Sequence, residues 1–202
     1  QPIQYVDFAE WQRELLEQED EKDGGWHRED PHLPADARSR LSLENENTVL
    51  QGRPPESISL ALNAGLVAEI DRISSARRVS SGIFLLAGWQ LLVWRLTGRK
   101  DLVIDYLHEG RRIRKLQTAV GTFARFCPVQ FHLEPDYRFI EMLEMVDQSV
   151  SAASAILNNL LRRDGRKIED EYLADKANAV GFEYEEWPGV EHAGAVKFTY
   201  WR

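Results

Sequence analysis

Histidines, the side chains best suited to acid–base or metal chemistry at neutral pH, are few and scattered in this sequence. Its five histidines are His27, His32, His108, His132 and His192, and no two are adjacent. His27 and His32 have acids between them but no matching cysteine set, so their spacing does not predict a zinc site. No serine lies in a nucleophile elbow and no glycine loop has phosphate-binding spacing. These residues alone therefore predict no catalytic centre and no bound metal.

Cys127 is the only cysteine, so an intrachain disulfide is excluded and a reducing compartment, the cytoplasm, is the simplest expectation. It lies in an apolar run, "FCPVQF", which predicts a small buried hydrophobe rather than a nucleophile.

One basic cluster stands out, formed by Arg111, Arg112, Arg114 and Lys115. Guanidinium groups there could bind an acidic partner or a phosphate, or the cluster could be a solvated loop. His108 precedes this cluster at the end of an apolar run; it could line a cleft, but we expect it to be exposed.

The net charge of −8 over 202 residues argues against non-specific binding to nucleic acid or to an anionic membrane. Hydrophobic residues make up 43% of the chain, enough for a sizeable core. The most apolar stretch, 83–96, is interrupted by Gln90 and Arg95 and falls short of a membrane span.

Apolar periodicity places helices and strands around these residues. Residues 4–20 predict an amphipathic helix whose stripe includes Tyr5, Phe8, Trp11 and Leu15. Residues 20–56 predict a long connection anchored by Trp26 and Leu33. Residues 57–62 alternate as in a strand, and a helix capped by Asn63 follows over 63–78, with an inward face expected at Leu66, Val67, Ile70 and Ile73.

Further helices and strands are predicted in the second half of the chain. Residues 80–98 predict a central helix that is apolar on nearly every side, between serine caps and Gly98. Residues 101–107 and 126–133 predict strands, the second at an edge or bulged because of Pro128. Residues 136–162 predict a long helix with Met142 and Met145 in its core face. Residues 179–187 and 194–201 predict strands joined by a hairpin connection at 188–193.

Both ends of the chain suggest a larger domain. The first helix begins with an aromatic stripe ready to pack, and the last predicted strand runs into Arg202. We therefore expect this chain to be a segment of a longer protein.

Four sequence motifs in order resemble the condensation domains of nonribosomal peptide synthetases. "PIQYVDFAEWQ" is similar to that family's Y-x-D-F-A-x-W motif, through Tyr5, Asp7, Phe8, Ala9 and Trp11. "FLLAGWQLLVWRLTGRKDLVID" resembles its buried helix, turn and strand, and Arg111 stands where the strand-end loop carries arginine. "AVGTFARFCPVQFHLE" resembles its next motif through Val120, Gly121, Thr122 and Phe123.

The chain also departs from the family pattern. Arg125 and Phe126 replace the usual Asn-Thr, and the later His-Gln-Asp-x-Pro-Phe-Glu motif is not recognisable in "AILNNLLRRDG". The active-site motif His-His-x-x-x-Asp-Gly is missing; in the family it precedes the Y-x-D-F-A-x-W helix. The resemblance therefore covers the segment after the catalytic histidines.

The resemblance implies a partial α/β fold of the chloramphenicol-acetyltransferase type, a mixed sheet with packed helices. Residues 1–56 would be the linking helix and connecting segment between the lobes, and residues 57–202 the second lobe. The parent domain would join acyl or aminoacyl groups carried as thioesters on phosphopantetheine, with the missing histidine pair positioning or deprotonating the acceptor amine. This chain would bind no cofactor itself and would be inactive alone. Its partners would be carrier proteins, the other lobe and neighbouring synthetase domains.

The resemblance also nominates residues for the wall of the substrate tunnel. The candidates for the tunnel or for carrier binding are His108, Gly110, Arg111, Gly121, Phe123 and Arg125, and the structural motif is Tyr5, Asp7, Phe8 and Trp11. Each candidate could instead serve packing only. Arg125 could pair with Asp105 or Glu109, reach solvent, or face a pantetheine phosphate. We expect the aromatic stripe to be buried against the second lobe, with Trp11 included. The competing class is a non-catalytic carrier-docking or scaffold module of the same fold.

Overall fold

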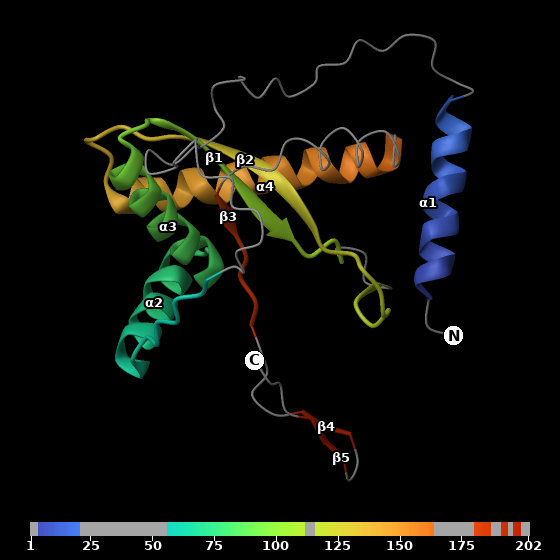
Figure 1. Cartoon of the computed structure of the whole chain (residues 1–202), viewed down its shortest axis with the longest axis horizontal. Coiled ribbons are helices and arrows are strands. Elements are labelled where there is room, and N and C mark those ends of the chain that lie inside the picture. Colours follow the sequence, from blue (N-terminus) through green and yellow to red (C-terminus); the bar gives the residue numbers. More distant parts are fainter. Residues whose placement is uncertain are drawn as a thin grey trace.

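A small mixed sheet, packed against two long helices, is the centre of the fold in the computed structural model (Figure 1). The structure describes residues 4–20, 56–111, 116–163, 180–186, 191–193 and 196–198. The helices α1 and α2 lie at opposite sides of this centre, and a separate β-hairpin follows near the C-terminus.

The sheet is built from three strands in the order β2-β1-β3. β1 (Asp101–His108) and β2 (Arg125–His132) are antiparallel, and their register pairs Asp101 with His132 at one end and His108 with Arg125 at the other. β3 (Gly181–Phe182) runs parallel to β1. β2 is thus an edge of the described sheet, where Pro128 costs no ladder hydrogen bond on the open side, as its position predicted.

Two long helices, α3 (Ser81–Thr97) and α4 (Phe139–Arg163), contact each other and the sheet. α3 begins at the predicted serine cap, where the Ser80 hydroxyl accepts the N–H of Ile83, and ends at Gly98 with a φ of 68°. Only glycine adopts that left-handed conformation without strain. The shared core consists mainly of Ile83, Leu86, Leu102, Ile104, Val129, Phe131, Leu143 and Val146. Met142 and Cys127 are buried in it, as predicted.

The expectation that α3 is buried on nearly every side is wrong for the described part of the chain. Residues spaced by three and four are buried, from Ile83 to Val93, but Leu92 is 47% exposed and Leu96 is 53% exposed. The sheet and α4 cover one face of the helix, and the other face carries apolar side chains in solvent. The apolar composition of a helix does not reveal how many neighbouring elements cover it. The sequence therefore predicted more burial of α3 than the described residues show.

α2 (Ala64–Arg77) is capped as predicted, since the Asn63 carboxamide oxygen accepts the N–H of Leu66 at 2.8 Å. Its inward face is narrower than predicted. Ile70 is buried and Ile73 half-buried, but Leu66 and Val67 are exposed, which corrects their expected position.

The predicted strand at 57–62 is not formed. Residues 56–63 have no regular structure, and Ile58 and Leu60 are almost fully exposed. A strand needs a neighbour to pair its backbone, and among the described strands none lies beside this segment.

α1 (Tyr5–Asp20) matches the predicted first helix, and α1 contacts α4. The C-terminal hairpin differs from the prediction: β4 (Glu191–Ala193) and β5 (Val196–Phe198) pair with each other, so part of the predicted connection is itself a strand. The predicted anchors Trp26 and Leu33, and the side chains of Leu15 and Leu157, lie outside the described residues.

Within the described ranges, no single helix has the length and apolar character to cross a membrane. α2 and α3 meet that criterion only when taken together, and they are bent by 104° relative to each other.

Candidate functional site

The first turn of α1 positions the aromatic motif. Asp7 accepts the backbone N–H of Gln4 at 2.9 Å, and Gln4 also accepts the N–H of Phe8. This is the reciprocal half of a capping box, in which an acid three residues into the helix binds back to the cap. The acid in the Y-x-D-F-A-x-W pattern is therefore explained by the start of the helix.

Three rings join α1 to the loop before β2. The Phe123 ring lies edge-on to Tyr5 and to Phe8, with centroids 5.2 Å apart in both pairs. Phe123 is 4% exposed, and Leu116 and Ala119 complete a small apolar cluster around it. Edge-to-face ring pairs of this kind add to the gain from burial alone.

Trp11 does not share this burial. It follows Phe8 at a centroid distance of 6.0 Å, but it is 45% exposed. The expectation of a buried Trp11 is therefore wrong, since Phe123 reaches only the first two rings of the stripe.

Arg111 binds the loop on which Phe123 lies. Its guanidinium donates to the carbonyl oxygens of Leu116 at 2.8 Å, Ala119 and Gly121 at 3.2 Å. The same group lies over the Phe123 ring, with Cζ 4.4 Å from the centroid. A planar group with five donors suits several carbonyls and a ring face at once, which an ammonium group does not.

Two glycines allow the chain to come this close. Gly110 has a φ of 69°, and a Cβ there would collide with the backbone carbonyl of Phe123. A Cβ on Gly121 would collide with the Tyr5 ring. Glycine at both positions is thus required by close packing, and at Gly110 by the left-handed backbone as well.

His108 is buried, which corrects the expectation that it is exposed. Its Nδ1 accepts the backbone N–H of Gly110 at 2.9 Å. Nδ1 therefore carries a lone pair in this arrangement, and in the neutral ring the proton lies on Nε2.

Arg125 is half-buried and lies opposite His108 in the β1–β2 register. The six nominated residues therefore meet at one end of the β1–β2 ladder, and we call them the strand-end cluster: His108, Gly110, Arg111, Gly121, Phe123 and Arg125. The other cations of the predicted basic cluster, Arg112, Arg114 and Lys115, lie outside the described residues.

Sequence reasoning missed the acceptors that hold Arg111. Leu116 and Ala119 accept through their backbone carbonyls, which every residue type has. The one sequence feature near them is that both are apolar and follow the basic cluster. Among the described residues, no group of three His, Cys, Asp or Glu side chains could hold a metal ion. Burial raises the pKa of the Cys127 thiol to about 11, with a further contribution from Asp105, so this thiol is protonated at neutral pH.

The chain belongs to the condensation domain family, whose sequence model matches residues 1–158. Solved structures of similar fold are also found. The structure of SgcC5 from Streptomyces globisporus aligns with 98% of this chain at a TM-score of 0.64 and 22% identity. The X-domain from teicoplanin biosynthesis aligns with 87% of it at a TM-score of 0.53 and 25% identity. These neighbours share the α/β fold predicted from the sequence motifs.

Curated relatives include bacitracin synthase 2 of Bacillus licheniformis, 25% identical over 153 residues, and the phosphinothricin tripeptide synthetase PhsC of Streptomyces viridochromogenes, 26% identical over 156 residues. The alignments cover 73% and 76% of this chain, but only 6% of the first relative and 14% of the second. The chain also spans 46% of the SgcC5 structure and 39% of the X-domain structure. It therefore corresponds to a small part of its curated relatives.

Proposed function

We propose that this chain is the second-lobe part of a condensation domain that joins two carrier-bound thioesters. The chain supplies tunnel wall and acceptor-side structure, and the catalytic histidines come from the first lobe. Its partners are carrier proteins bearing phosphopantetheine, the other lobe and neighbouring synthetase domains. The single cysteine favours the cytoplasm as the compartment.

The reaction is amide formation. The acceptor amine attacks the donor thioester carbonyl, a C–N bond forms, the C–S bond breaks, and the donor pantetheine leaves as a thiol that takes up the proton lost by the amine. A base placed near the amine accelerates this step, which is the role that the resemblance gives to the histidine pair. Residues of this chain hold the second wall in place.

One observation carries the proposal most directly. The strand-end cluster packs on the first helix, because the Phe123 ring contacts Tyr5 and Phe8 while Arg111 binds the same loop. The two parts that resemble separate family motifs therefore form one unit, at the place where a linking helix would join the lobes. This contact supports a fixed position of the second lobe relative to the first.

The second candidate is a non-catalytic docking or scaffold module. Arg111 favours it, since its guanidinium is engaged by three backbone carbonyls and therefore stabilises shape rather than offering a group for reaction. The two candidates share the fold and differ in the state of the first lobe.

The test uses the complete domain, first lobe included, with donor and acceptor carriers loaded with thioesters. Mass spectrometry detects the amide on the acceptor carrier. Product that disappears when the second histidine of the upstream motif is replaced by alanine supports the enzyme. Carrier binding without product supports the scaffold, and neither binding nor product would contradict both.

A further inference from the structure

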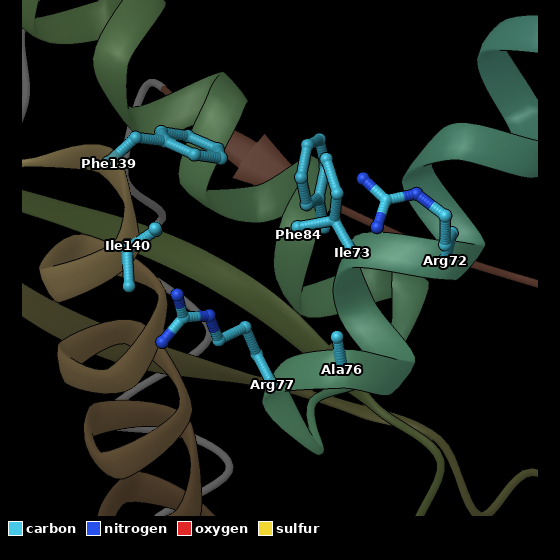
Figure 2. A pocket seen from close by; sticks show the side chains of 7 residues that line it. All are labelled: Arg72, Ile73, Ala76, Arg77, Phe84, Phe139 and Ile140. Atoms are coloured by element: carbon cyan, nitrogen blue, oxygen red, sulfur yellow. The ribbon is translucent and has the colours of Figure 1, made fainter.

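A pocket of about 310 Å³ opens between α2, α3 and the first turn of α4 (Figure 2). Its walls are the side chains of Ile73, Phe84, Phe139 and Ile140. α1 lies at the other side of the sheet, so this pocket is separate from the strand-end cluster that packs on α1 (Figure 1).

The walls are apolar, and two of their side chains contact each other. Phe84 and Phe139 meet edge-to-face at 5.1 Å between centroids, which joins α3 to α4. Ile140, one of the lining residues, is 39% exposed, so the pocket is open to solvent on that side. A volume near 300 Å³ is the lower end of the range for small-molecule sites, large enough for a phenyl ring or a short branched acyl chain.

Two arginine side chains, Arg72 and Arg77, also line this apolar space with their aliphatic parts. Arg72 already has an acid partner, because its Nε and Nη2 both donate to the Glu69 carboxylate, at 2.8 and 2.6 Å. Arg77 extends from α2 toward Ile140 (Figure 2), and within the described residues its guanidinium has no hydrogen bond or ion pair. Glu141, next to Ile140 on α4, accepts the backbone N–H of Arg138 at 2.8 Å instead.

Among the described residues, no acid forms an ion pair with Arg77, so this side chain contributes one positive charge beside the pocket. An apolar cavity alone would bind a neutral ligand best, and a surface arginine alone would remain hydrated by water. Their combination favours a molecule that has both an apolar body and a single negative charge, since burial of the body and a charge-assisted hydrogen bond then act together.

We propose that this pocket binds a short aryl or branched acyl carboxylate. The apolar body lies against Phe84, Phe139 and Ile140, and the carboxylate pairs with Arg77. A planar guanidinium can donate to both carboxylate oxygens at once, which sets the direction in which the ligand enters.

The test is a titration of the full chain with hydrocinnamate and with its neutral analogue of the same size, hydrocinnamamide, by isothermal calorimetry and amide NMR shifts. We expect the acid to bind roughly tenfold more tightly than the amide at low ionic strength, and salt to reduce this preference. The shifts should concentrate at α2 and the first turn of α4. Arg77→Gln should abolish the preference for the acid, and Arg95→Gln, an exposed arginine on α3 outside the pocket, should keep it.

Ala76→Leu is a second variant, because Ala76 also lines the pocket and leucine suits a helix while filling the space. It should remove binding of both probes with the circular dichroism spectrum unchanged. The proposal is contradicted if neither probe binds the unmodified chain, if the amide binds as tightly as the acid, or if the preference survives Arg77→Gln.

Discussion

At the residue scale, Arg111 joins several parts of the strand-end cluster. It donates to three carbonyl oxygens and covers the Phe123 ring. We predict that Arg111→Ala lowers the free energy of unfolding by about 2–4 kcal/mol, because hydrogen bonds to a charged group contribute more than neutral ones and the carbonyls lose their donors together. Arg111→Lys should recover only part of this loss. Urea denaturation measures both, and an Arg111→Ala cost no larger than that of Arg95→Ala would contradict the assignment.

Arg78, directly after α2, has a left-handed backbone with a φ of 58° and a ψ of 31°. Its N–H still closes the helix by donating to the carbonyls of Ser74 and Ser75. Glycine adopts this conformation without a steric cost, so Arg78→Gly should raise stability by about 0.5–1 kcal/mol. Thermal unfolding checks it, with Arg78→Ala as the matched control that keeps the Cβ and should bring no gain. An equal rise for both variants would show that the charge, and not the backbone, is responsible.

His132 links the two strands at the end opposite the strand-end cluster. Its Nδ1 lies 2.8 Å from Asp101, its Nε2 lies 3.0 Å from Glu134, and hydrogen bonds to these two acids raise its pKa above 6.5. A raised pKa in the folded state means that the protonated ring stabilises the fold. The contribution is complete below pH 6.5 and is lost as the pH rises through the raised value.

The stability difference between the unmodified chain and His132→Gln should therefore be larger at about pH 5.5 than at about pH 8.5. Thermal unfolding across this range measures it, and NMR titration of the ring gives the pKa directly. A difference that grows toward alkaline pH would be opposite in sign to this argument.

At the element scale, Tyr5 and Phe8 are the described side chains of α1 that pack on the Phe123 cluster. Phe123 is buried against Tyr5 and Phe8, whereas Trp11 is 45% exposed. We predict that Phe123→Ala costs about 3–5 kcal/mol, as for other buried aromatic rings. Trp11→Ala should cost well under that, because a half-exposed ring leaves no closed cavity. Urea unfolding of both variants compares them, and a larger cost for Trp11→Ala would place the main contact of α1 elsewhere.

The elements that the sequence predicts well are those whose signals are local. Asn63, Ser80 and Gly98 mark helix ends by the hydrogen bonds and backbone angles that they make with their own neighbours. Pro128 likewise indicates an edge strand through its missing donor. The segment 57–62 fails because its signal, alternation, describes a strand that needs a partner from elsewhere in the protein.

The candidate site was likewise predictable from the sequence only in part. The motifs identify Tyr5, Phe8, Gly121 and Phe123, and the structure brings them into contact. The part played by Arg111 could not be predicted, since its acceptors are main-chain carbonyls that any residue provides. The burial of His108 depends on the fold of the following loop, which residue type does not encode.

At the scale of the whole molecule, the described chain has several apolar surfaces without a neighbour. Ile58 is 99% exposed and Leu60 is 85% exposed, and Leu92 and Leu96 lie on the open face of α3. Large apolar side chains in such positions are typical of interaction surfaces.

We propose that this chain contributes structure to amide formation and that the reacting histidines lie outside it. The most direct measurement compares the chain alone with the complete domain in one assay, using the same loaded donor and acceptor carriers and mass spectrometry of the acceptor. We predict amide product from the complete domain and only the uncatalysed background from the chain. Product above background from the chain alone, or none from a complete domain with its histidine pair intact, would contradict the account.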